Sequence, residues 1–154
     1  MSDAVISIED PSAADVRELL DAHLAYARAN SPPEAVHALE IDGLAEPGVT
    51  FFSYRRDGEL LGVAALRELD QAHAEIKSMH TAETAREQGV ARALLSHMLA
   101  VGRSRGYRRV SLETGSQDAF QGARSLYESE GFEPCEAFGG YPPSEHSVFM
   151  TRPV

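Results

Sequence analysis

The chain has 154 residues and a net charge of −10, with 43 % hydrophobic and 25 % charged residues. We expect a single domain over residues 1–154, because this length suits one hydrophobic core. The sequence shows no signal peptide and no apolar run long enough to span a membrane, which favours a cytoplasmic protein. The single cysteine, Cys135, excludes an internal disulfide and a cysteine-based zinc site.

The charge is distributed unevenly along the chain. Residues 1–85 carry 16 acidic and six basic side chains, whereas residues 86–109 carry six arginines and one acidic residue, Glu87. We expect no nucleic-acid partner, because phosphate binding needs clustered cations, and no membrane partner. Two interpretations of the basic segment stay open: a solvated helix face, or a local site for an anionic ligand.

The predicted elements alternate between strands and helices, which indicates a mixed α/β fold. A capping-box pattern of Ser12 and Asp15 opens the first predicted helix, and Asp57-Gly58 marks the turn of a hairpin. In chain order we expect a strand at 4–10, helices at about 12–27 and 31–39, a hairpin over 49–66, a strand at 71–81, a helix at about 89–105, a strand at 107–114, a helix at about 118–130, and strands at 132–138 and 146–152.

Periodicity also predicts which side chains share one face in three of these elements. The strand at 71–81 alternates, with one face carrying Glu75, Lys77 and Met79. Both later helices repeat apolar residues at helical spacing. The first of these faces consists of Val90, Ala91, Leu94, Leu95, Met98 and Leu99, and the second of Phe120, Ala123, Leu126 and Tyr127.

The helix at 89–105 begins without a capping side chain. Gly89 is a poor helix former, and no serine, threonine or aspartate precedes it directly. Its first backbone N–H groups need another partner, and an anion is favoured there by the helix dipole. Arg86 and Arg92 bracket this turn and can pair with phosphate oxygens. The alternative is a tight loop whose amides are satisfied by water.

Other phosphate-binding motifs are missing from the sequence. There is no G-x-x-x-x-G-K-[ST] loop and no complete G-x-G-x-x-G. Instead, Arg86-x-x-Gly89-x-Ala91 follows a predicted strand and opens a helix, and residues 123–132 read ARSLYESEGF. These two motifs resemble the [QR]-x-x-G-x-[GA] and A-x-x-L-Y-x-x-x-G-F signatures of the GCN5-related N-acetyltransferases (GNAT). Segments such as EIKSMHT and SLETGS are most similar to the small bacterial YsnE-like branch.

The resemblance implies a single-domain α/β GNAT fold. Its central mixed, largely antiparallel sheet would have six to seven strands, flanked by about four helices. The sheet would be splayed between the strands at 71–81 and 107–114. The resemblance also implies acetyl-CoA (coenzyme A) as cosubstrate. We expect no metal, because no histidine spacing suggests a metal site. A homodimer is possible in such a family.

The family resemblance also implies which residues contact the cosubstrate. The pyrophosphate would bind amides from Gln88 to Arg92, and the pantetheine arm would extend the strand ending at Met79, His80 and Thr81. Phe120 stands where many members have an asparagine, so that contact would pass to Ser116 or Gln117. The implied cofactor-binding residues are Met79, His80, Thr81, Arg86, Glu87, Gln88, Gly89, Val90, Ala91, Arg92, Ser116, Phe120, Ala123 and Tyr127.

Acetyl transfer to an amine needs a base for the nitrogen and an acid for the leaving thiolate. Tyr127 matches the family's tyrosine and is the acid candidate, with a core tyrosine as the alternative. Glu75 is the leading base candidate, with a salt bridge as the alternative, and Glu113 is the second candidate. His80 is a weaker one that would act through water.

The acceptor pocket is expected between residues 30–37 and 138–146. The implied substrate-binding residues are Ser31, His37, Glu113, Thr114 and Tyr141. The predicted function is an acetyl-CoA-dependent N-acetyltransferase that acts directly on an amine of a small molecule or peptide. The alternative is a non-catalytic acyl-CoA-binding or regulatory module on the same fold. A weaker possibility is a hydroxyl acceptor or a different acyl donor.

Overall fold

The computed structural model describes residues 4–33 and 41–154. These residues form one seven-stranded sheet in the order β1-β2-β3-β4-β5-β7-β6, confirming the predicted mixed α/β fold. The strands are β1 (Ala4–Ile8), β2 (Val49–Arg56), β3 (Glu59–Asp70), β4 (His73–Thr81), β5 (Arg109–Gly115), β6 (Glu133–Cys135) and β7 (Ser147–Pro153). Only β4 and β5 pair in parallel.

Four α-helices lie among the described residues: α1 (Ala14–Asn30), α2 (Ile41–Leu44), α3 (Val90–Ser104) and α4 (Gln121–Ser129). Two 3-10 turns, η2 (Glu83–Ala85) and η3 (Asp118–Phe120), precede α3 and α4. The helix predicted at 31–39 falls mostly on residues 34–40 and lies outside the described residues. No helix in the described part of the chain is long and apolar enough to cross a membrane.

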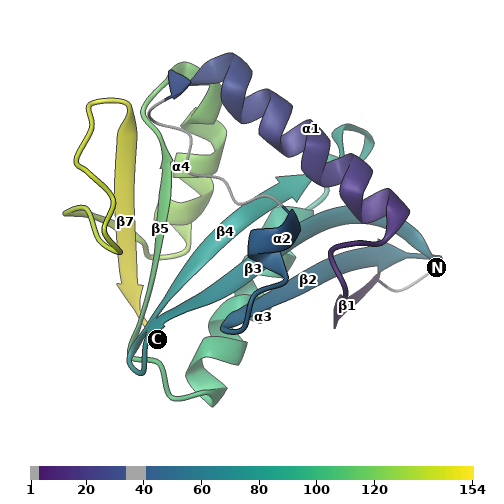
Figure 1. Cartoon of the computed structure of the whole chain (residues 1–154), viewed down its shortest axis with the longest axis horizontal. Helices are drawn as coiled ribbons and strands as arrows, with labels where there is room; N and C mark the ends of the chain where they lie inside the picture. Colours follow the sequence, from purple (N-terminus) through teal and green to yellow (C-terminus); the bar gives the residue numbers. More distant parts are fainter. Residues whose placement is uncertain (1–3, 34–40) are drawn as a thin grey trace.

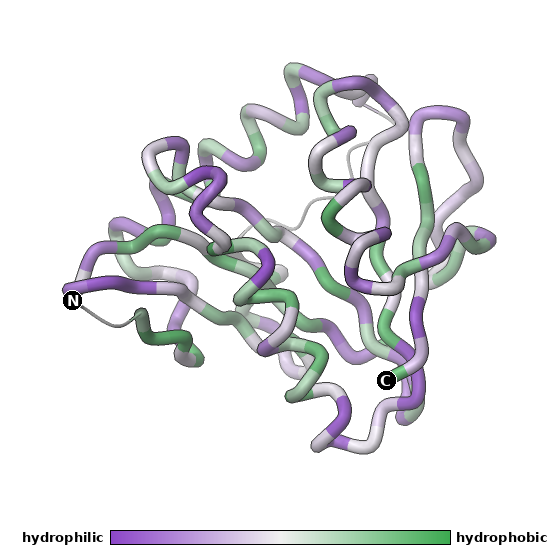
Figure 2. The backbone as a smooth tube through the Cα atoms, turned by 180° about the vertical axis from the view of Figure 1, so that it is seen from behind, coloured by the Kyte–Doolittle hydropathy of each residue, from purple (hydrophilic) through white to green (hydrophobic). Residues whose placement is uncertain are grey.

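The helices cover the two faces of the sheet in pairs. α1 and α2 lie on the face turned to the viewer in Figure 1, and α3 and α4 lie behind the sheet. Figure 2, seen from behind, shows α3 and α4 in front of the strands. Two apolar clusters follow this division. One joins α1 and α2 to β2 and β3, and the other joins α3 and α4 to β2, β3, β4, β5 and β7. The predicted apolar face of α3 is confirmed, since Val90, Leu94, Leu95, Met98 and Leu99 are buried.

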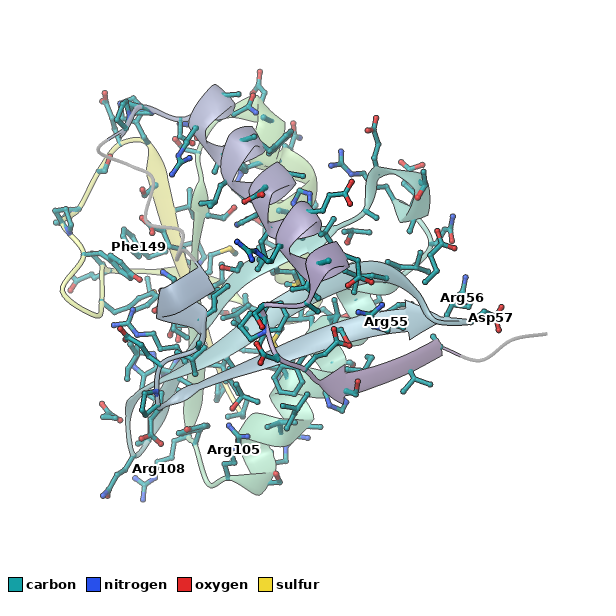
Figure 3. The ribbon with its side chains drawn as sticks, turned by 45° about the vertical axis from the view of Figure 1, so that its right-hand side comes forward. Arg55, Arg56, Asp57, Arg105, Arg108 and Phe149 are labelled. Atoms are coloured by element: carbon teal, nitrogen blue, oxygen red, sulfur yellow. The ribbon has the colours of Figure 1, made fainter. Side chains whose placement is uncertain are left out.

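The predicted capping box of α1 is wrong. The N-cap residue is Ala13, and no side chain caps the helix. The Asp15 carboxylate is instead bound by Arg55, whose guanidinium also binds Glu9, with closest N···O distances of 2.7 Å. Figure 3 shows Arg55 at the end of β2, beside the turn at Asp57. This ion-pair cluster ties the start of α1 to the β2–β3 hairpin, and it uses the carboxylate that the capping box required.

The sheet opens between β4 and β5. Their ladder joins His73–Ile76 to Arg109–Leu112 and stops there, although β4 continues to Thr81 and β5 to Gly115. Beyond that point β4 pairs only with β3, and β5 pairs only with β7. Figure 1 shows the two strands diverging towards the end of the sheet that α1 crosses. The predicted splay is therefore present.

A bulge in β4 breaks the alternation that the sequence predicts. Ser78 has a φ of 55°, and the register with β3 shifts between Val63 and Ala65. A bulge adds a residue to one strand and so resets which face the next side chains occupy. Met79 therefore packs against the cluster of α3 and α4, on the face opposite to the one predicted for it, and His80 contacts α1.

Candidate functional site

The gap in the sheet forms a cavity of about 490 Å³. Its walls come from both sides of the sheet: α1 contributes His23 and Tyr26, whereas α4 contributes Ala123, Leu126 and Tyr127. Because these helices cover opposite faces, the cavity passes through the sheet. The exposed ends of β4 and β5 form its sides, through Met79, His80, Thr81, Leu112, Glu113, Thr114 and Gly115.

A second cavity of about 490 Å³ adjoins the first at the start of α3. The two share lining residues, including Thr81, Arg86 and Ala91, and the second also includes Gly89. Gly89 is the N-cap of α3 with a φ of 81°, and no side chain caps this helix. A Cβ atom at Gly89 would meet nothing within 4 Å. The helix therefore begins with uncapped amides that face open space, which suits an anionic ligand.

The six arginines of the basic segment do not form one site. Arg86 and Arg92 lie at the start of α3 beside the second cavity. The other four lie at the opposite end of α3: Arg103 in its last turn, and Arg105, Arg108 and Arg109 after it. A 15-residue helix is roughly 22 Å long. Figure 3 shows Arg105 and Arg108 together at that far end. An anion site built from this segment is therefore limited to Arg86 and Arg92.

The two arginines near the cavities differ in their surroundings. Arg92 forms an ion pair with Glu130, at the end of α4. The Arg86 guanidinium lies over the Tyr26 ring, 5.9 Å from its centroid, and lines both cavities. Gln88 donates a hydrogen bond from its side chain to the Thr84 carbonyl, at 3.2 Å. Arg86 is therefore the guanidinium best placed for a ligand that runs from α3 into the gap.

Tyr127 lies on α4 and lines the gap, and only 9 % of its surface is exposed. Burial raises the pKa of its hydroxyl to about 12, so this group keeps its proton at neutral pH. Its ring packs edge-to-face against Phe132. No described residue accepts a hydrogen bond from its hydroxyl, although the side chain lines the cavity. Tyr127 is therefore both a core residue and a proton donor available to a ligand.

The two predicted carboxylates have different surroundings. Glu75 is 1 % exposed and does not line either cavity. Tyr141 donates a hydrogen bond to its Oε1 at 3.2 Å, and Lys77 Nζ lies 3.5 Å from its Oε2. Glu113, in contrast, lines the gap. The geometry favours a structural ion pair for Glu75 and a ligand contact for Glu113.

Lys77 and Tyr141 complete this buried polar cluster. Lys77 Nζ donates to the Tyr141 hydroxyl at 2.5 Å, and burial lowers the pKa of the lysine. Burial and the Glu75 carboxylate raise the pKa of Tyr141. Tyr141 does not line the cavity, and its ring lies near Phe138 and Phe149, the latter labelled on β7 in Figure 3.

The other predicted residues divide between the cavities and the surface. Ser31, Thr114, Phe120 and Ala123 line the first cavity, Val90 and Arg92 line the second, and Glu87 lines both. Ser116 is exposed and bonds the Glu145 carbonyl at 2.7 Å, and neither Ser116 nor Gln88 lines a cavity. His37 lies outside the described residues.

Among the residues of the cavity wall that sequence analysis missed are His23 and Tyr26, both on α1. Helical spacing placed His23 on the buried face of α1, but nothing in the spacing indicated that this face meets the end of β4. Its Nδ1 lies 3.3 Å from Nδ1 of His80. Among the described residues, no group of three or more histidine, cysteine or acidic side chains is arranged to hold a metal ion.

Comparisons with known proteins agree with this geometry. A sequence model of the acetyltransferase (GNAT) family matches residues 15–132. The uncharacterized N-acetyltransferase YsnE of Bacillus subtilis (strain 168) is 46 % identical over 147 residues, covering 96 % of this chain and 97 % of that protein. A Klebsiella pneumoniae protein assigned as an acyl-CoA N-acyltransferase superimposes with a TM-score of 0.83 at 26 % identity, covering 97 % of both chains.

A structure with a bound ligand shares the fold at lower identity. The GNAT family acetyltransferase from Elizabethkingia anophelis, solved with acetyl-CoA bound, superimposes with a TM-score of 0.73. The two sequences are 18 % identical, and the superposition covers 98 % of each chain. At this low identity the likeness shows the fold alone.

Proposed function

This chain belongs to the acetyltransferase (GNAT) family and is an N-acetyltransferase of that family, and from this premise we propose its reaction and its site residues. The acetyl group passes directly from acetyl-CoA to an amine of a small molecule or peptide. The observation that carries the proposal is the continuous path from the uncapped start of α3 into the gap, where Tyr127 and Glu113 line one cavity.

The residues of this path fit acetyl-CoA. Uncapped amides from Gly89 to Arg92 and the Arg86 guanidinium suit a pyrophosphate. The unpaired edge of β4 at Met79–Thr81 suits the amide groups of a pantetheine arm. The cosubstrate supplies an activated thioester. The chain's own residues bind it, exclude water and handle the protons.

Tyr127 is the proposed general acid. When the amine nitrogen bonds to the acetyl carbon, the carbon–sulfur bond breaks and the thiolate needs a proton or a hydrogen-bond donor. The Tyr127 hydroxyl remains protonated because its pKa is raised to about 12, so it can donate throughout the neutral range. Direct transfer is favoured over an acetyl-cysteine intermediate, because Cys135 lies on the edge strand β6 and does not line a cavity.

Glu113 is the proposed carboxylate for the acceptor. It lines the gap with Thr114 and Ser31, on the part of the cavity that α1 also walls. A carboxylate there attracts the ammonium form of an amine and holds it beside the thioester. Glu75 remains a predicted base by family resemblance. However, its buried pairing with Lys77 and Tyr141 supports a role in holding the strands around the gap.

The proposal is tested by thiol release from acetyl-CoA with a panel of polyamines, amino acids and peptides. We expect turnover with at least one amine and a loss of about 100-fold in kcat for Tyr127→Phe, with an unchanged dissociation constant for acetyl-CoA. Tyr107→Phe is the matched control, because its hydroxyl bonds Glu68 away from both cavities. Tight binding without turnover across the panel would favour the alternative of a non-catalytic acyl-CoA-binding module.

The cosubstrate site has its own test. Gly89→Val introduces a side chain where ligand phosphates are proposed to bind, and we expect it to weaken acetyl-CoA binding at least 10-fold. Gly48→Val is the matched control, because Gly48 also has a positive φ, 88°, and open space around it, but lies outside both cavities. Equal effects of the two variants would show that backbone strain, and not a lost phosphate site, explains the result.

A further inference from the structure

Two histidines from different elements meet inside the proposed acceptor cavity. His23 on α1 and His80 at the end of β4 place their Nδ1 atoms 3.3 Å apart, and their ring centroids are 5.1 Å apart. Both side chains line the gap, together with Glu113 and Tyr127. The Ser78 bulge creates this contact, because without it His80 would face α3.

We propose that His23 and His80 act as one proton-accepting unit for the amine in the transfer reaction. This inference rests on the proposed function and identifies the base that the reaction needs. Glu113 then binds the acceptor, and the histidine pair removes its proton.

The contact between the two Nδ1 atoms determines the protonation pattern of the pair. A hydrogen bond between them requires that one Nδ1 carries the hydrogen and the other accepts it. The donor ring therefore has a free lone pair on Nε2, and the acceptor ring carries its hydrogen on Nε2. The two neutral rings have opposite tautomers, which is the arrangement of a relay.

The proton transfer balances in this arrangement. The bound ammonium first gives one proton to the free Nε2 of the donor ring, which frees the nitrogen lone pair to bond to the acetyl carbon. The Nδ1 hydrogen of that ring then passes to the partner, which releases its own Nε2 hydrogen to water, and proton exchange with water at the two Nε2 atoms restores the starting tautomers. The nitrogen loses its second proton to water as the carbon–sulfur bond breaks, and the thiolate sulfur takes the proton of Tyr127, which is restored from solvent. No oxidant or metal is required.

The surroundings keep both rings neutral at pH 7. Burial and, to a smaller extent, the charge of Lys77 lower the pKa of His23 to about 4. Burial also lowers the pKa of His80 to about 4, with contributions from His23 and Arg86. The other titratable groups that line the cavity are Tyr26, Glu87, Glu113, Tyr127 and His146. A phosphate paired with Arg86 would offset the smallest of the three contributions that lower the pKa of His80, so ligand binding should raise that pKa.

The first experiment is independent of turnover. Histidine-ring nitrogen NMR of the full chain at pH 7 should show one ring protonated at Nδ1 and the other at Nε2, with neither ring charged. Adding coenzyme A should raise the pKa of His80, and His97, which lines neither cavity, is the control. Identical tautomers for the two rings, or a His80 pKa that coenzyme A does not move, would overturn the relay.

The second experiment measures turnover of His23→Ala, His80→Ala and the double variant. We expect each single variant to lose about 100-fold in kcat. The double variant should lose no more than the worse single one, because the two residues act as a unit. Added imidazole should restore part of the activity of His80→Ala, which it would not do for a purely structural contact. His97→Gln is the control and should keep its activity.

The outcomes separate this inference from the proposed function. If the wild-type chain turns over an amine but the histidine variants lose less than threefold, or if the single losses multiply in the double variant, the histidine pair is not the base. If the wild-type chain releases no thiol with any amine, the proposed function fails, and the NMR result still decides whether the coupled pair exists.

Discussion

At the scale of single residues, the two candidates for the general base, Glu75 and Glu113, differ in their surroundings. Glu75 sits in a buried cluster with Lys77 and Tyr141, whereas Glu113 lines the cavity, from where its charge also acts on Lys77 and Tyr141. A buried carboxylate beside a buried lysine is costly to break, because the partner left behind keeps an uncompensated charge. Glu75 should therefore affect stability, and Glu113 should affect the acceptor.

We predict that Glu75→Ala lowers the free energy of unfolding by about 3 kcal/mol, because it strands the buried Lys77 ammonium. Chemical denaturation would measure this loss. The paired variant Glu75→Leu with Lys77→Met should recover most of the stability, because an apolar pair can replace a buried ion pair. A Glu75→Ala protein of wild-type stability would contradict the structural role.

We predict that Glu113→Gln raises KM for a cationic amine about 10-fold and changes kcat less than threefold, since its charge binds the acceptor rather than taking the proton. Steady-state kinetics with a cationic and a neutral acceptor would separate the two effects, because only the cationic acceptor should lose affinity. A fall in kcat with an unchanged KM would instead make Glu113 the base.

At the scale of elements, the start of α3 packs closely against β3 because Gly62, in β3, has no side chain. A Cβ atom at Gly62 would lie 2.6 Å from Val90 Cγ1 and 3.1 Å from Leu94 Cδ1. Val90 and Leu94 form the first turns of the helix whose amides are proposed to bind phosphate. The close approach of helix and strand therefore positions the cosubstrate site, through a residue that touches no ligand.

We predict that Gly62→Ala destabilises the protein by about 1–3 kcal/mol through overpacking of this contact. Thermal or chemical denaturation would measure the loss. Gly122→Ala in α4 is the matched control, because an added Cβ there meets nothing within 4 Å, and its stability should stay equal or rise slightly. Equal losses for both variants would contradict the packing argument.

At the scale of the whole molecule, the histidine pair links stability to pH. In the unfolded chain a histidine has a pKa near 6.5, whereas burial lowers the pKa of His23 and His80 to about 4 in the folded protein. Between these values the unfolded chain holds more protons, so stability falls as pH falls from about 6.5 to about 4. His73, whose pKa is also lowered by burial, contributes in the same direction.

We predict a fall in Tm of about 10 °C between pH 6.5 and pH 4.5, since the two histidines together lose about 4 kcal/mol over this range and for a chain of this size ~1 kcal/mol corresponds to about 2–4 °C. Scanning calorimetry across this range would measure it. The His23→Ala/His80→Ala variant should lose most of this slope, although His73 remains. The salt-bridged Glu9 and Asp15 have lowered pKa values too, but as carboxylates they act below this range. An unchanged slope in the variant would contradict the linkage.

The order of the strands and of α1, α3 and α4, the turn at Asp57-Gly58 and the buried face of α3 were predictable, because they depend on local periodicity and turn chemistry. The uncapped helix start and the LYESEGF segment identified the family from two short motifs. The capping box at Ser12 failed because a distant side chain, Arg55, competed for the Asp15 carboxylate.

The sequence by itself therefore determined the fold family and predicted a path for the cosubstrate and a tyrosine in the gap, since each rests on residues close together in the chain. Only the tertiary structure decided which carboxylate reaches the cavity and which is buried in an ion pair. It also decided that His23 meets His80, which lies 57 residues later in the chain. That contact depends on a bulge at Ser78 and on the crossing of α1 over β4, and neither leaves a periodic signal in the sequence.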